Sequence, residues 1–136
     1  MPNSTPGAIF IPGNVPSSKN TKSAFKVRSK KTGKERLVIV GSKLSKDWVA
    51  LTENDWREKR DSFLKLLDGK VKPYMIGFQF VRSSRRKFDY INPAQTAQDA
   101  MVKHCWLFDD NADEIVPVFL PYTYDKENPG VYIHVL

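Results

Sequence analysis

Hydrophobic and polar residues alternate in several short segments of the chain, a pattern that predicts β-strands. The clearest segment is YMIGFQFVR, residues 74–82, in which large apolar side chains take positions 74, 76, 78 and 80 and so share one face. Short apolar runs bounded by Gly, Pro, Asn or Ser predict further strands. These strands are expected at 8–12, 22–28, 36–41, 114–124 and 130–135. A cationic turn, SKKTGKE, joins the second and third of these, so they are expected to form a hairpin.

A different spacing, with apolar residues three and four positions apart, predicts a first helix. It runs from Ser45, a suitable N-cap, to Asp68, and Gly69 follows where a helix commonly stops. Trp48 and Trp56 fall on its apolar positions, so they are expected in the core.

A second helix is expected from Asn92 to Cys105, because Asn92 suits the N-cap and Pro93 the first helical position. Its apolar face, which should pack on the sheet, comprises Ala94, Ala97, Met101 and Cys105. The element order β-β-β-α-β-α-β-β predicts an α+β fold. We expect a single domain, residues 1–136, with a mixed β-sheet and two main helices.

Composition narrows the class of protein. With 136 residues, 40% of them hydrophobic, the chain is long enough for one core. No apolar run approaches the roughly 18 residues that a membrane span needs, and the first residues lack the features of a secretory signal. Cys105 is the one cysteine, which excludes an internal disulfide and a cysteine-based zinc site. A soluble cytoplasmic protein without a membrane partner is expected.

Charge is distributed unevenly along the chain. The formal net charge is +7, but residues 1–46 contain ten Lys or Arg against one acid, whereas the remaining ninety residues have a net charge of −2. Such asymmetry indicates a polyanionic partner for one region and a different role for the other. A protein that is basic without any such partner is the alternative.

The segment from 82 to 115 combines bases and acids in a way that suits phosphodiester chemistry. Four cations open it, namely Arg82, Arg85, Arg86 and Lys87. Six acids and one strong base, Lys103, follow between positions 89 and 114. Cations bind a phosphate backbone, while carboxylates bind Mg²⁺, which prefers oxygen ligands.

Helical geometry refines this expectation. Asn92, Gln95 and Asp99 fall together on the side of the second helix opposite its apolar face. Asp89 lies just before the helix, at the positive end of its dipole, where an anion or a phosphate is favoured. Ordinary surface charges and a polar turn at 109–111 are the alternative explanation.

Three motifs occur in a characteristic order: Asp89-Tyr90-Ile91-Asn92, then Asp99-Ala100, then Asp109-Asp110. A Pro-Ser-Ser-Lys-Asn stretch at 16–20 precedes them. In these features the chain resembles the RusA-like Holliday junction resolvases, also called crossover junction endodeoxyribonucleases. The resemblance spans most of the chain.

The resemblance implies a small α+β homodimer that nicks four-way DNA junctions symmetrically with Mg²⁺, for which Mn²⁺ can substitute. Such an enzyme would resolve branched DNA in recombination and repair, in the cytoplasm of a bacterium that encodes it itself or through a prophage or phage. Asp89 and Asp110 match the metal-binding positions, and the catalytic candidates are Asp89, Asp99, Asp109 and Asp110. The candidate DNA contacts are Lys19, Asn20, Arg82, Arg85, Arg86 and Lys87.

Two positions depart from the motif of the family. Ile91 replaces its second aspartate, and Gln95 replaces its lysine. Asp99 or Asp109 is a candidate for the missing ligand, and Lys103 or Lys19 for the missing cation. The departures leave a catalytically inactive junction-binding protein as the alternative. An RNA-binding domain is a weaker alternative, because the chain lacks the aromatic RNP motif and a KH-type GxxG loop.

Overall fold

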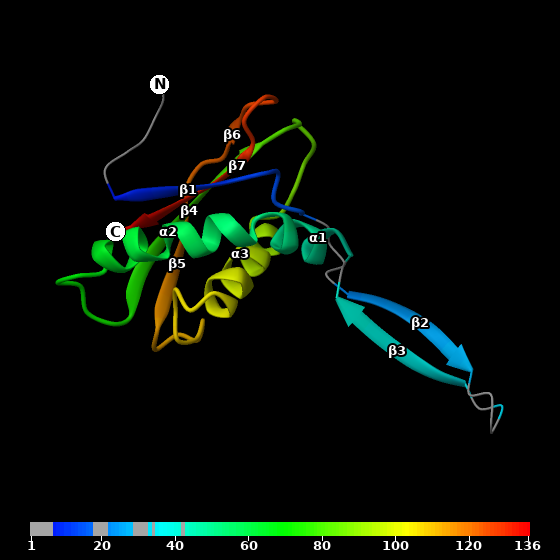
Figure 1. Cartoon of the computed structure of the whole chain (residues 1–136). Coiled ribbons are helices and arrows are strands. Elements are labelled where there is room, and N and C mark those ends of the chain that lie inside the picture. The colour runs from blue at the N-terminus through cyan, green and yellow to red at the C-terminus, as the bar shows by residue number, and fades with distance from the viewer. Residues whose placement is uncertain (1–6, 18–21, 29–32, 34, 42) are drawn as a thin grey trace.

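The centre of the structure is a mixed five-stranded β-sheet. The computed structural model describes residues 7–17, 22–28, 33, 35–41 and 43–136. Strands β1 (Ala8–Pro12), β7 (Gly130–Val135), β4 (Tyr74–Arg82) and β5 (Ile115–Phe119) lie side by side in that order (Figure 1). A short strand, β6 (Thr123–Tyr124), also pairs with β4. The β1–β7 and β7–β4 pairs are antiparallel, whereas β5 and β6 run parallel to β4. The predicted α+β class with a mixed sheet is confirmed.

Three helices, not two, accompany the sheet: α1 (Lys43–Leu51), α2 (Glu53–Leu66) and α3 (Ile91–Lys103). The single helix expected over 45–68 is interrupted at Thr52, whose φ and ψ are −102° and 8°. The Thr52 hydroxyl donates to the Trp48 carbonyl oxygen at 2.8 Å and accepts from the Trp56 indole nitrogen at 3.0 Å. A threonine side chain that bonds to the preceding turn bends a helix, which accounts for the break.

Apolar residues of the strands and helices meet in one core. Ile76, Phe78 and Phe80 of β4 are fully buried, as their alternation predicts. They join buried residues of β1 and β7 and the predicted core tryptophans Trp48 and Trp56.

Helix α3 covers the sheet with small side chains. Ala94, Ala97 and Met101 are buried as predicted, but Cys105 is exposed. The expectation for Cys105 is wrong because α3 ends at Lys103 and the backbone turns at Cys105, where φ is 62°. The start is also earlier than expected, since α3 begins at Ile91.

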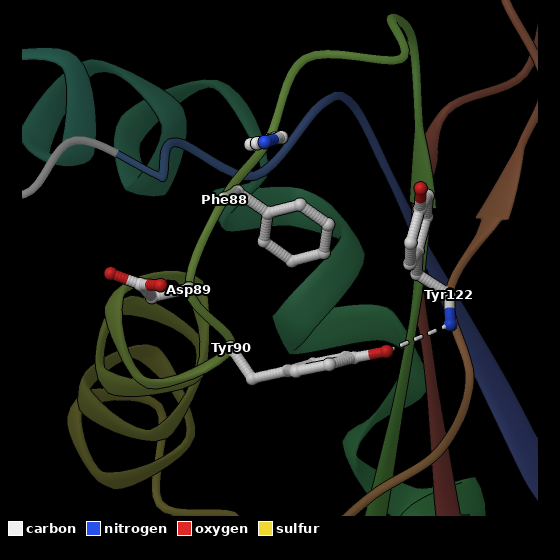
Figure 2. Close-up of a pocket in the computed structure, with 5 residues that line it drawn as sticks. Phe88, Asp89, Tyr90 and Tyr122 are labelled. Carbon is white, nitrogen blue, oxygen red and sulfur yellow. Dashed lines mark hydrogen bonds between the residues drawn. The ribbon is translucent and has the colours of Figure 1, made fainter.

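The chain from β4 through α3 to β5 forms a crossover between parallel strands, so α3 runs antiparallel to β5. The single strand expected over 114–124 is divided into β5 and β6. Pro121 lies between them and has no N–H to donate to a strand ladder. The interruption at residues 120–122 takes Tyr122 out of the sheet and to the side of Tyr90 (Figure 2).

Strands β2 (Lys22–Arg28) and β3 (Glu35–Gly41) pair antiparallel in a separate two-stranded sheet, which confirms the predicted hairpin. Figure 1 shows the hairpin extending away from the main sheet and its helices. In the part of the chain that the structure describes, no helix is both long and apolar enough to cross a membrane.

Candidate functional site

The acidic residues that the sequence singles out lie around α3. Asp99 is in the second half of the helix, and Asp109 and Asp110 are in the loop between α3 and β5. The crossover brings this loop back toward the helix, so that the charge of Asp110 acts on Asp99. Asp110 is thus close enough to Asp99 for its charge to be felt there.

Three interactions act on the Asp99 carboxyl group. Partial burial raises its pKa, a hydrogen bond from the Gln95 side-chain amide at 3.1 Å lowers it, and the negative charge of Asp110 raises it again. The net result is a pKa above the ordinary value. A cation bound between Asp99 and Asp110 would offset both effects that disfavour the charged form.

Asp109 has a different role in the same loop. One of its carboxylate oxygens accepts from the Asp110 backbone N–H at 2.8 Å, and the other accepts from the Asn111 side-chain amide at 2.9 Å. These hydrogen bonds, the backbone bond first, lower the Asp109 pKa. Asp109 therefore stabilises the turn, and Asp99 is the better candidate for the ligand that Ile91 cannot provide.

Asp89 lies at the opposite end of α3. It is exposed, and its carbonyl oxygen accepts from the Asn92 N–H at 3.3 Å in the first turn. The eight steps from Ile91 to Asp99 correspond to about 12 Å of helix at 1.5 Å per residue. The chain does run back along α3, but the stretch that arrives beside Tyr90 contains Phe119 and Tyr122.

Within the described residues, no three His, Cys, Asp or Glu side chains are gathered as a metal site. A single ion shared by Asp89 and Asp110 stays a prediction.

Arg82 is not the surface cation that the sequence suggests. Its side chain is 6% exposed, and its guanidinium donates to the Val15 carbonyl oxygen at 2.6 Å and to the Ser17 hydroxyl at 2.8 Å. The same group lies 4.6 Å from the ring centre of Phe88. We therefore correct its expected role: Arg82 fixes the loop after β1 to the end of β4 and is not placed to contact DNA.

The other cations of this segment are on the surface. Arg85, Arg86 and Lys87 are exposed, and the Arg85 guanidinium lies 4.4 Å from the ring centre of Tyr124. The remaining DNA-contact candidates, Lys19 and Asn20, lie outside the described residues. Arg85, Arg86 and Lys87 therefore form one exposed basic segment in the loop that leads into α3.

An aromatic pocket next to this basic segment was not predicted from the sequence. Its lining residues are Lys87, Phe88, Asp89, Tyr90 and Tyr122, and its volume is about 450 Å³. Figure 2 shows the Phe88, Tyr90 and Tyr122 rings turned toward one another, whereas the Asp89 carboxylate points to the other side. The sequence does contain a signal for this pocket, because aromatic residues alternate with other residues at 88–90 and at 122–124. The second of these stretches falls in the strand expected over 114–124.

The two residues that depart from the family motif, Ile91 and Gln95, lie at different places on α3. Ile91, the first residue of α3, is 69% exposed and offers no ligand atom. Gln95 donates its hydrogen bond to Asp99, so it orients a carboxylate instead of providing a charge. Lys103, one turn beyond Asp99, is exposed and is the nearest lysine along that side of the helix.

Comparison with known proteins does not identify a family or a function for the chain. No protein-family model matches the chain, and a search of curated proteins finds no match. Function is therefore inferred from the residues of the site and from their placement.

Proposed function

We propose that the protein is a Mg²⁺-dependent, structure-selective endodeoxyribonuclease that resolves Holliday junctions and other branched DNA by paired nicks. The observation that carries the proposal is the placement of the acidic motifs, Asp99 on α3 and Asp110 in the loop that leads from α3 back to β5. These positions match two of the three acidic motifs by which the chain resembles the RusA-like resolvases. The proposal extends to a role in DNA recombination and repair.

The donor set of the candidate site suits Mg²⁺. This ion prefers one or two protein carboxylates and completes its shell with waters and a substrate phosphate. Asp99 and Asp110 would hold it, whereas Asp89, which matches the other metal position of the family, lies at the opposite end of α3, about 12 Å along the helix. When bound, Mg²⁺ polarises a phosphoryl oxygen and makes water a stronger nucleophile. Gln95 keeps one Asp99 oxygen oriented, and Asp109 holds the turn that carries Asp110.

The basic residues would bind the DNA backbone without reading its sequence. Arg85, Arg86 and Lys87 lie exposed in the loop before α3, where phosphates would approach Asp89. The β2–β3 hairpin adds further positive charge, because its strands contain Lys22, Lys26, Arg28 and Arg36 against one acid, Glu35.

Symmetric cleavage requires two active sites. We infer a homodimer, because a two-fold axis relating two subunits would match the approximate two-fold symmetry of a four-way junction. Sedimentation at micromolar concentration tests this part of the proposal. A monomer of 15.6 kDa with and without junction DNA would contradict paired cleavage.

A catalytically inactive junction-binding protein is the second candidate. The exposed Ile91 favours it, since this residue occupies the position at which the family motif has a carboxylate. The two candidates differ in one measurable property, the nicking of a synthetic four-way junction when Mg²⁺ or Mn²⁺ is added.

The first prediction concerns the carboxylates in this assay. Asp110→Asn and Asp99→Asn should each lower the nicking rate at least about a hundredfold, because each removes a charged ligand of the proposed ion, and a hundredfold corresponds to about 2.7 kcal/mol of barrier. Junction binding in EDTA should be preserved or improved, since a negative charge near phosphate is removed.

Asp113→Asn is the matched control. It lies in the same loop as Asp110, its backbone N–H donates to the Asn111 side-chain oxygen at 2.9 Å, and its side chain is exposed. Normal nicking by Asp110→Asn would refute the metal-site assignment. If the wild type binds junctions but never nicks them, the inactive candidate is supported. Ile91→Asp would then show whether a restored carboxylate confers activity.

A further inference from the structure

The rings of the aromatic pocket are held in a fixed arrangement. The ring centres of Phe88 and Tyr122 are 5.1 Å apart with nearly perpendicular planes, and those of Phe88 and Tyr90 are 5.3 Å apart. Tyr90 stacks on Phe119 at 5.5 Å, and its hydroxyl oxygen accepts from the Tyr122 backbone N–H at 3.1 Å. The pocket is therefore already formed without a ligand.

Large aromatic side chains around this pocket are unusually exposed. Tyr122 is 44% exposed, Phe119 41% and Tyr124 39%. Clustered aromatic surface of this kind is characteristic of a binding site. Flat aromatic faces also stack on nucleobases, a mode of recognition that tolerates any base.

The charges around the aromatic pocket favour an anionic ligand. Lys87 and Asp89 both line the pocket, but the Asp89 carboxylate points away from the rings (Figure 2), and the adjacent Arg85 and Arg86 are exposed. A cationic ligand, such as a methylated lysine, is disfavoured because guanidinium groups already lie over the Phe88 ring of the pocket and over the neighbouring Tyr124 ring. These are Arg82 at 4.6 Å from Phe88 and Arg85 at 4.4 Å from Tyr124.

We propose that the aromatic pocket binds one unpaired nucleobase of DNA, which stacks on the exposed ring of Tyr122 while Lys87 and its basic neighbours contact the flanking phosphates. The volume of about 450 Å³ lies in the range of small-molecule sites, so a single nucleotide fits. In a duplex both faces of each base are covered by neighbouring bases, whereas a branch point offers unstacked bases. The site would thus select branched or single-stranded DNA, and it rests on the proposed function only in taking DNA as the ligand.

The test compares single-stranded DNA of about 15 nucleotides with a duplex of the same sequence, in EDTA and by fluorescence anisotropy. Tyr122→Ala and Tyr122→Leu should lower the affinity for the single strand about tenfold or more, because both lose the aromatic face. The duplex affinity should change less than about twofold, since its bases are not available for stacking. Tyr122→Phe should restore single-strand binding.

Folding does not confound this comparison. Tyr122 is 44% exposed, its hydrogen bond with Tyr90 uses the backbone N–H, which every variant retains, and Tyr122→Leu keeps a side chain that can pack on Phe88. Phe108→Ala is the matched control, because Phe108 is 89% exposed and lies outside the pocket. It should bind single strands as the wild type does.

Three results would overturn the inference: unchanged single-strand affinity of Tyr122→Ala, an equal loss for the duplex, or Tyr122-dependent binding of a trimethyllysine peptide in place of DNA. A shift from dimer to monomer on Tyr122→Ala with unchanged DNA affinity would identify the patch as a subunit interface and would also overturn it.

The inference and the proposed function fail separately. A wild type that never nicks but shows the Tyr122 effect refutes the nuclease alone, whereas normal nicking without the Tyr122 effect refutes the pocket alone.

Discussion

Arg82 and Arg86 lie four positions apart in one basic segment, yet their surroundings differ. The Arg82 guanidinium is buried against Val15, Ser17 and Phe88, and burial lowers its pKa. Arg86 is exposed. The charge of Arg82 is therefore used inside the protein, whereas that of Arg86 is available to a partner.

We predict that Arg82→Ala lowers the free energy of unfolding by about 3 kcal/mol, because the buried Val15 carbonyl oxygen loses a charged donor. Arg86→Ala should change it by less than about 0.5 kcal/mol, as is usual for an exposed side chain. Urea denaturation followed by circular dichroism measures both values. Equal effects of the two substitutions would contradict the structural role of Arg82.

At the scale of elements, the pairing of β1 with β7 depends on a close approach at Gly130. A Cβ at this position would contact the Ile11 carbonyl oxygen and would lie 2.5 Å from the Phe10 ring. Because a main-chain oxygen cannot move away as a flexible side chain can, this crossing requires glycine. The first and last strands of the fold are joined here, far apart in sequence.

Gly130→Ala should therefore destabilise the protein by about 1–3 kcal/mol, the range for overpacking a filled interior. Gly77→Ala is the control on neighbouring β4, where the nearest atom to a new Cβ is a Leu120 side-chain carbon at 3.2 Å. The control should have the smaller effect, since a leucine end can shift. Thermal unfolding midpoints compare the two variants, and a larger effect at Gly77 would contradict the close approach.

At the scale of the whole molecule, positive charge is concentrated in the first third of the chain, whereas the acidic candidate residues lie in the second half. The first 46 residues, which include the projecting hairpin, hold a net charge of +9, and fourteen of the fifteen acids lie in the remaining residues, six of them between positions 89 and 114. The exposed segment Arg85–Lys87 is the basic part closest to α3 in the chain.

We predict that the affinity for DNA falls steeply with salt, with a log–log slope of about −0.9 per phosphate contact. Replacing Arg85 and Arg86 together by Ala should weaken binding to all sequences and should make this slope less steep by about 1.8 if both contact phosphates. Lys65→Ala with Lys70→Ala removes the same charge from exposed positions elsewhere. If the control pair changes the slope as much, net charge and not the basic segment governs binding.

The sequence identified the elements best where periodicity is strong. The alternation at 74–82 predicted β4 and its buried face, and the apolar run at 8–12 predicted β1 within the correct bounds. It did not predict the interruptions that single residues cause within an element. Thr52 divides a helix through its own hydroxyl, and Pro121 divides a strand through a missing donor.

Of the candidate site, the sequence by itself determined the residue types: carboxylates on and around α3 and cations before it. Only the tertiary structure decided which of them meet. It places Asp110 near Asp99, engages Asp109 in a turn, buries Arg82 and brings Tyr122 beside Tyr90. The physical reason is that periodicity reports which face of one element is apolar, whereas the approach of side chains from different elements depends on how those elements pack.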